Sequence, residues 1–211
     1  QSVTNTLTYL IIQVPIMLIL AVIFASLLNN RDLKFRGLFR TCIFLPCATG
    51  LVAYSMIFRT LFTYDGMVNN MLLKFGLISE AINWLNDPVY AKAVIIIGLV
   101  WRWTGYNMVF YLSAMQSIDY SIYEAARIDG ANSYQQLMRI TIPLLRPIIL
   151  VTAIMSTNGT LQLFDESVNL TRGGPGHMTI TMSHYIYNTM FTKNPNFGYA
   201  AAMSFVILVM V

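Results

Sequence analysis

The sequence has few charged side chains. Of its 211 residues only 10% are Asp, Glu, Lys or Arg, whereas 56% are hydrophobic. A soluble globular domain carries about 25% charged residues, so this composition excludes the ordinary soluble class and favours a membrane protein. The net charge of +4 comes from basic residues dispersed between apolar segments. No nucleic-acid-binding face is therefore predicted.

Residues that could form a metal or catalytic site are equally scarce. Cys42 and Cys47 lie five residues apart in one apolar segment, where a helix would point them in different directions, so we expect buried free thiols. His177 and His184 have no cysteine or carboxylate cluster nearby. The adjacent carboxylates at 165–166 would not face one another on a helix. We therefore predict no metal site and no catalytic residue.

Four apolar stretches are long enough to cross a membrane, since a transmembrane helix needs about 20 predominantly apolar residues. The predicted spans are Leu7–Leu28, Thr41–Phe62, Ala91–Met115 and Pro143–Leu163. A fifth apolar stretch begins near Gly198. The predicted fold is therefore an all-α polytopic helix bundle, with a single transmembrane domain over residues 1–211.

Two details of these stretches bear on packing and on completeness. Pro46 and Gly50 interrupt the second stretch, and such interruptions are tolerated where neighbouring helices satisfy the freed backbone groups. This favours a packed bundle over separate membrane anchors. The sequence begins with Gln1 and ends at Val211 inside an apolar run. We therefore expect a piece of a longer protein, truncated at both ends.

Lysine and arginine in the loops predict the orientation, because cytoplasmic loops carry an excess of them. One side carries Arg31, Lys34, Arg36, Arg40, Arg127, Arg139 and Arg146. The other side carries Arg59, Lys74, Lys92, Arg172 and Lys193. The density at 31–40 places that loop and the loop at 116–142 in the cytoplasm, so that 64–90 and 164–197 face outward. Within 64–90 we expect a short amphipathic helix, with Trp84 anchoring it at the membrane interface.

A patterned polar segment lies between the third and fourth predicted spans. It runs from Glu124 to Pro147 and contains E-A-A, three residues, G, nine residues and I-x-x-P. A solvated connector is the alternative interpretation, because most loops only join elements. The order of this segment favours an element that contacts another molecule in the water.

Local signals predict a helix, a turn and a second helix within this loop. Ser121 with Glu124, and Ser133 with Gln136, each fit a capping box, which marks a helix start. The dipeptide at 129–130, Asp-Gly, is a helix-ending signal.

The loop resembles the cytoplasmic EAA loop of the membrane subunits of ATP-binding-cassette importers that work with a solute-binding protein. Ile142 departs from that pattern, since the family usually has Leu there. Two further stretches, Val100–Ile118 and Phe164–Thr179, resemble the carbohydrate-uptake branch, of the maltose permease type, with Arg172 standing where Gly or Asn is common. The positions that fit the EAA pattern are Glu124, Ala125, Ala126, Gly130, Ile140 and Pro143.

The resemblance implies a fold of the type I importer transmembrane-domain kind and a division of labour. The EAA loop would be a coupling helix that docks on a separate ATPase, whose closure swings the membrane helices. Glu124 would contact basic or polar groups of the ATPase, Ala125 and Ala126 would pack against it, and Gly130 would allow the turn. The coupling residues so implied are Glu124, Ala125, Ala126, Asp129, Gly130, Ile140 and Pro143.

The same resemblance implies the partners and the location. A second permease subunit, usually a different chain, an extracytoplasmic solute-binding protein and the ATPase subunits would assemble in the cell membrane of a prokaryote. ATP and Mg²⁺ would bind to the ATPase. The sequence holds no G-x-x-x-x-G-K-[ST], so we do not expect this chain to hydrolyse ATP.

Polar residues inside the spans are candidates for a solute pathway. Asn107 and Tyr111 lie four residues apart on one helical face, and Asn158 and Gln162 form a second polar patch. Together with the resemblance they favour a sugar or oligosaccharide; interhelical hydrogen bonding is the alternative role. An ATP-independent secondary transporter, the alternative function, would place carboxylates in the membrane. None of the four complete spans contains Asp or Glu.

Overall fold

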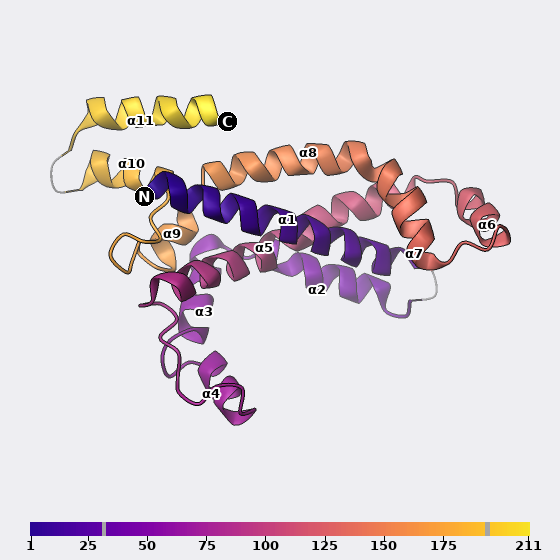
Figure 1. The fold of residues 1–211 in the computed structure, drawn as a ribbon, viewed down its shortest axis with the longest axis horizontal. Helices are drawn as coiled ribbons and strands as arrows, with labels where there is room; N and C mark the ends of the chain where they lie inside the picture. The colour runs from indigo at the N-terminus through magenta and orange to yellow at the C-terminus, as the bar shows by residue number, and fades with distance from the viewer. Residues whose placement is uncertain (31–32, 193–194) are drawn as a thin grey trace. The chain divides into compact units, whose positions relative to one another are not determined.

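The fold is helical throughout the part of the chain that the computed structural model describes, residues 1–30, 33–192 and 195–211 (Figure 1). No strand occurs in these ranges, which confirms the all-α prediction. Arg31 and Lys193, used to predict the orientation, lie outside them. The elements are α1 (Ser2–Asn29), α2 (Arg36–Ala48), α3 (Leu51–Leu61), α4 (Met67–Lys74), α5 (Pro88–Gln116), α6 (Tyr120–Ile128), α7 (Ser133–Gln136), the π-helical η1 (Leu137–Thr141), α8 (Ile142–Leu161), α9 (Asp165–Asn169), α10 (Met182–Phe191) and α11 (Phe197–Met210).

Three described helices are long and apolar enough to cross a membrane: α1, α5 and the continuous helix Ser133–Leu161, which joins α7, η1 and α8. The second predicted span is broken instead into α2 and α3, and it makes a fourth crossing if the pair is counted as one span. The break falls at Thr49 and at Gly50, whose backbone is extended. The fifth apolar stretch forms α11.

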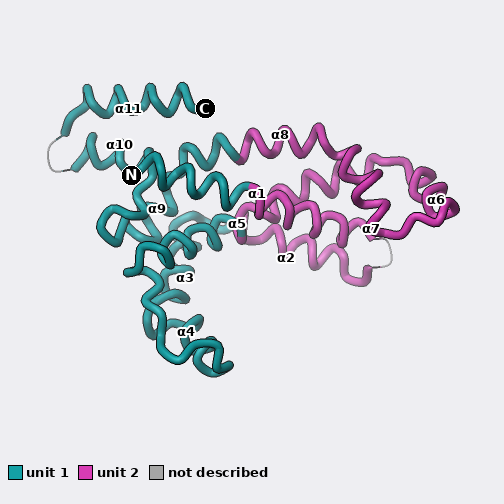
Figure 2. Tube along the Cα trace, viewed as in Figure 1, with its two compact units in different colours: residues 1–14, 49–100, 157–211 teal, residues 15–48, 101–156 magenta. Residues whose placement is uncertain are grey.

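The helices contribute to two compact units (Figure 2). Unit 1 comprises residues 1–14, 49–100 and 157–211, and unit 2 comprises residues 15–48 and 101–156. Helices α1, α5 and α8 each supply residues to both units. Each unit therefore depends on contacts between segments that are distant in the sequence.

Unit 2 has an apolar core between three helices. Its buried members recur every three or four residues along α1 and α5, the spacing that puts side chains on one helical face. Helix α5 also approaches α2 closely, because a Cβ built on Gly105 would lie 2.0 Å from the Ile43 carbonyl oxygen. The buried cluster consists of Ala21, Ala25, Leu28, Met108, Tyr111, Leu112, Met115 and Leu145.

In unit 1, polar side chains of α1 hold the segment that precedes α10. Asn5 Nδ2 donates to the Ile180 carbonyl at 3.0 Å, and Thr6 Oγ1 accepts from the Met182 amide at 3.2 Å. Because an unpaired buried backbone group is costly, these bonds allow a loop to pass through a buried region. They fix the path of the chain from α9 to α10.

The segment 64–90 contains the expected short helix, α4, and Trp84 makes several contacts within and beside this segment. Its indole N–H donates to the buried Asn69 Oδ1 at 2.8 Å, and its ring packs edge-on against Phe62 and Tyr90. Asn69 Nδ2 also donates to two backbone carbonyls of the segment. The segment is therefore folded around an amide whose hydrogen-bonding capacity is well used.

We expect Gly105→Ala to destabilise the protein, because the added methyl group would overlap a backbone oxygen of α2 and force the two helices apart. Overpacking of this kind costs about 1–3 kcal/mol. The measurement is the thermal unfolding midpoint in detergent. Gly159→Ala is the matched control, because Gly159 also lies inside a helix but has nothing within 4 Å of its built Cβ. Equal midpoints for the two variants would contradict the prediction.

Candidate functional site

The first helix of the EAA loop, α6, begins at Tyr120 and is capped by Asp119. The Asp119 carboxylate accepts from the Ser121 amide at 3.0 Å. The predicted cap at Ser121 is therefore wrong. The carboxylate of Asp119, two residues earlier, accepts the hydrogen bond of the Ser121 amide and caps the helix. Hydrogen bonds from the Ser121 backbone and side chain hold the pKa of Asp119 below its ordinary value. Its negative charge lies where the helix dipole favours it.

The turn after α6 forms where the sequence predicted it. Gly130 has φ +82°, and its amide donates to the Arg127 carbonyl at 3.0 Å. The Ala131 amide donates to the Ala126 carbonyl at 2.8 Å. This pair of bonds is the Schellman motif, whose left-handed position favours glycine. The turn at Asp129–Gly130 is therefore a defined structure.

Helix α7 is capped one residue earlier than predicted. Asn132 Oδ1 accepts from the Gln135 amide at 2.8 Å, and Gln135 Oε1 accepts from the Asn132 amide at 2.9 Å. The box predicted at Ser133 and Gln136 is therefore wrong, because Asn132 occupies the cap position. Gln136 is buried instead, and its Nε2 donates to the Ala131 carbonyl at 2.8 Å.

A π-helical turn, η1, joins α7 to the span formed by α8. It ends at Thr141, two residues before Pro143, which has no N–H to donate and therefore disturbs the regular α-helical bonding before it. The buried Thr141 Oγ1 donates to the Gln136 carbonyl at 3.3 Å and lies 3.0 Å from the Tyr123 hydroxyl of α6. π-Turns are frequent at functional sites. Here a side-chain hydrogen bond links α6 to the start of the span.

The coupling residues predicted from the EAA pattern differ in exposure. Glu124, Ala125, Asp129 and Gly130 are exposed, whereas Ala126, Ile140 and Pro143 are half-buried. Sequence reasoning missed Ile128, which is 87% exposed at the end of α6, and Tyr134, which is 67% exposed on α7. The sequence signal that could have identified Ile128 is its position as an apolar residue between Arg127 and Asp129 in a polar loop.

The predicted pathway residues on α5 are buried and already hydrogen-bonded within unit 2. Asn107 Nδ2 donates to the Trp103 carbonyl at 3.1 Å. The Tyr111 hydroxyl lies 2.6 Å from Thr152 Oγ1 of α8. Both side chains thus make the helix-to-helix or local bonds that buried polar groups require.

The pathway residues at the end of α8 lie in unit 1 and are more accessible. Asn158 is half-buried and Gln162 is exposed, and Gln162 Nε2 donates to Asn158 Oδ1. Within residues 1–30, 33–192 and 195–211, no three His, Cys, Asp or Glu side chains come together as a metal site. The accessible polar groups of Asn158 and Gln162 are therefore their side-chain amides.

The whole of residues 1–211 matches the protein family described as binding-protein-dependent transport system inner membrane component. The chain belongs to this family. Its relatives are transport permeases, not enzymes.

Two curated relatives are similar to this chain over its whole length. It is 56% identical to the lactose transport system permease protein LacF of Rhizobium radiobacter, over 100% of this chain and 72% of the relative. It is 35% identical to the arabinooligosaccharides transport system permease protein AraP of Halalkalibacterium halodurans, over 100% of this chain and 66% of the relative. The chain thus spans about two thirds of the length of these permeases.

The permease fold is also shared with a solved structure. A bacterial ABC transporter involved in the import of the acidic polysaccharide alginate matches with a TM-score of 0.87 and 27% identity, over 99% of this chain and 74% of that one. The match confirms the predicted helical fold of an importer membrane domain.

We expect Gly130→Ala to loosen the turn between α6 and α7. A Cβ built on Gly130 meets nothing within 4 Å, so the substitution causes no steric overlap. The free-energy cost, about 1 kcal/mol, comes from the left-handed backbone conformation alone. Hydrogen exchange of the amides of residues 126–131 in the purified permease measures the effect. Gly130→Asn is the control, because asparagine tolerates this conformation. Identical exchange in the two variants would contradict the explanation.

Proposed function

We propose that this chain forms part of the membrane pathway of an ATP-driven importer for a sugar or oligosaccharide. The observation that carries the proposal is the capped, rigid loop at 116–142, which presents an exposed apolar side chain and is hydrogen-bonded to a span. Family membership and relatives named for lactose and arabinooligosaccharides support the solute class.

The ATPase docks on α6 and the turn after it. Ile128 is exposed although it is apolar, and burying such a side chain contributes about 1.5–3 kcal/mol. Glu124 and Asp129 flank it with negative charge for basic groups on the ATPase. The small Ala125 and Ala126 let the partner pack closely, and Gly130 permits the turn. ATP and Mg²⁺ bind to the ATPase and not to this chain.

Motion passes from the docked loop to the membrane through η1. Tyr123 on α6 is hydrogen-bonded to Thr141, which lies in the π-turn at the start of α8. Ile140 and Pro143 lie in the same junction. Because the π-turn and α8 form one continuous helix, displacement of α6 is transmitted to the span as a rigid body, with ATP biasing two arrangements.

The importer is assembled in the cell membrane of a prokaryote from several chains. A second permease subunit, two ATPase subunits and an extracytoplasmic solute-binding protein complete it. Loops 31–40 and 116–142 face the cytoplasm. The start of α2 lies at the same end of unit 2 as α6, which supports this common orientation (Figure 2). Segments 64–90 and 164–197 face outward.

Asn158 and Gln162 lie on the solute pathway. Their amides are accessible and bond to one another, so sugar hydroxyls can replace that bond at little cost. Asn107 and Tyr111 contribute only if the solute offers hydrogen bonds in place of those to Trp103 and Thr152.

The decisive experiment purifies the full-length protein with its membrane partners and reconstitutes it in vesicles. We expect an ATPase subunit to co-purify and a sugar-loaded solute-binding protein to stimulate ATP hydrolysis and sugar uptake together. Uptake that continues with no ATPase present would overturn the proposal in favour of a secondary transporter. Stimulation that no sugar produces would overturn the solute class alone.

We predict that Ile128→Asp prevents stable docking. Loss of a buried isoleucine contact and introduction of a buried charge should lower the amount of co-purified ATPase by at least about tenfold. Phe75→Asp is the control, since Phe75 is 70% exposed in the segment placed on the opposite side of the membrane. Equal losses of ATPase in the two variants would show that Ile128 has no special role.

We predict that Tyr123→Phe and Thr141→Val each uncouple hydrolysis from transport while leaving ATPase binding intact. Either change removes the same hydrogen bond without removing an apolar surface. Sugar uptake per ATP hydrolysed should fall several-fold. The double variant should be no worse than Thr141→Val, which removes the shared bond and also the bond from Thr141 Oγ1 to the Gln136 carbonyl. Additive losses would argue against a shared link.

A further inference from the structure

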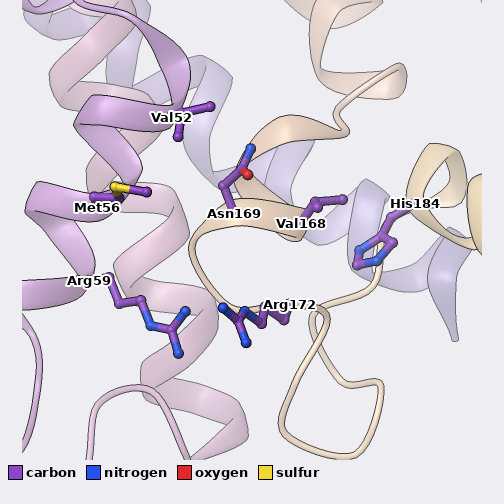
Figure 3. A pocket seen from close by; sticks show the side chains of 7 residues that line it. All are labelled: Val52, Met56, Arg59, Val168, Asn169, Arg172 and His184. Atoms are coloured by element: carbon purple, nitrogen blue, oxygen red, sulfur yellow. The ribbon is translucent and has the colours of Figure 1, made fainter.

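Unit 1 contains a cavity of about 330 Å³ that none of the predicted residues explains, since it is reached by neither the EAA loop nor the pathway candidates. Helix α3 contributes Arg59 and two apolar side chains, α9 contributes Asn169, and the following turn contributes Arg172. Figure 3 shows that Arg59 and Arg172 extend into the same space from facing segments. Its volume is in the range of small-molecule sites.

The cavity is positively charged. No carboxylate lines it. Within the described residues, the side chains of Arg59 and Arg172 form no ion pair and no hydrogen bond. His184 adds no charge at neutral pH, because burial first, and then repulsion by His177, lowers its pKa. Ser167 Oγ donates to the Thr179 carbonyl, so it accepts from His184 Nδ1 at 2.8 Å. Two guanidinium groups therefore share a cavity whose lining includes no carboxylate.

The backbone at Arg172 supports a role for its side chain. Arg172 has φ +54°, in the left-handed region where a side chain is strained. Gly and Asn tolerate that conformation more readily than Arg does. Arginine bears the strain here, and strained residues persist where the surroundings fix them and cluster at functional sites.

The surroundings do fix this turn. A Cβ on the next residue, Gly173, would lie 2.5 Å from Ile180, so the turn cannot shift toward it. Thr179 Oγ1 donates to the Gly174 carbonyl at 2.7 Å and lies 2.8 Å from Thr171 Oγ1. The guanidinium of Arg172 is thus presented from a rigid support, which lowers the entropy lost when it binds a ligand.

We propose that Arg59 and Arg172 form a carboxylate-binding site. A guanidinium presents parallel N–H donors that match the two oxygens of a carboxylate, and two of them can hold one carboxylate between them. Asn169 lines the same cavity and can donate a further hydrogen bond through its amide. The carboxylate belongs either to an acidic sugar or to an acidic side chain of the solute-binding protein.

The test compares glucuronate with glucose, which carries a neutral hydroxymethyl group in place of the carboxylate, by calorimetric titration of the full-length protein in detergent. We expect glucuronate to bind and glucose to bind at least about tenfold more weakly. Arg172→Asn should abolish the difference in affinity between glucuronate and glucose. It should not lower the unfolding midpoint, because asparagine relieves the backbone strain. Lys74→Asn, which removes an exposed charge away from the cavity, is the control and should keep the difference.

Equal binding of the two sugars, or a preference for glucuronate that survives in both Arg172→Asn and Arg59→Gln, would overturn the proposal. The titration needs no ATPase, so it succeeds or fails separately from the proposed importer function. The source of the carboxylate follows from the assembled importer. If Arg172→Asn weakens stimulation of ATP hydrolysis by the binding protein loaded with a neutral sugar, the partner supplies the carboxylate. If stimulation is unchanged, an acidic sugar supplies it.

Discussion

Internal satisfaction of backbone hydrogen bonds is the constraint on which the rest of this structure depends. Lipid offers no donors or acceptors, so a chain that exposes Ile11, Ile19 and Leu27 along α1 must pair its own amides and carbonyls. Helices meet this requirement in the spans. Where helices end, side chains replace backbone partners, as Asp119 and Asn132 do in the EAA loop. The caps are therefore what allow an ordered polar loop to emerge from an apolar bundle.

The same constraint limits which polar side chains are free for a solute. Within unit 1, Thr160 Oγ1 donates to Gln13 Oε1 at 3.0 Å between α8 and α1. Within unit 2, Tyr111 and Thr152 link α5 and α8. In each case a polar group inside the apolar region is matched by another from the same chain. Accessible polar groups remain at the end of α8 and in the arginine cavity.

Sequence patterns predicted the elements well where the signal is local. Apolar length gave the spans at α1, α5 and α8, though not the break between α2 and α3. Asp-Gly gave the turn at residue 130, because that signal depends on neighbouring residues alone. The caps were misplaced because Ser, Asp and Asn can all serve as N-caps, so the boxes at Ser121 and Ser133 fitted the pattern as well as the true ones. The π-turn at 137–141 was missed because it reflects the junction of two helices with Pro143, which no periodicity marks.

The arginine cavity could not be predicted, because it depends on contacts between distant parts of the sequence. Arg59 was placed near the end of the second predicted span and Arg172 in the outward segment 164–197. Only the packing of α3 against α9 brings the two together. The loop at 116–142, in contrast, is one short segment whose geometry is fixed by its own caps. The loop is therefore easier to recognise from sequence than the arginine cavity, which depends on packing between α3, α9 and the turn at Arg172.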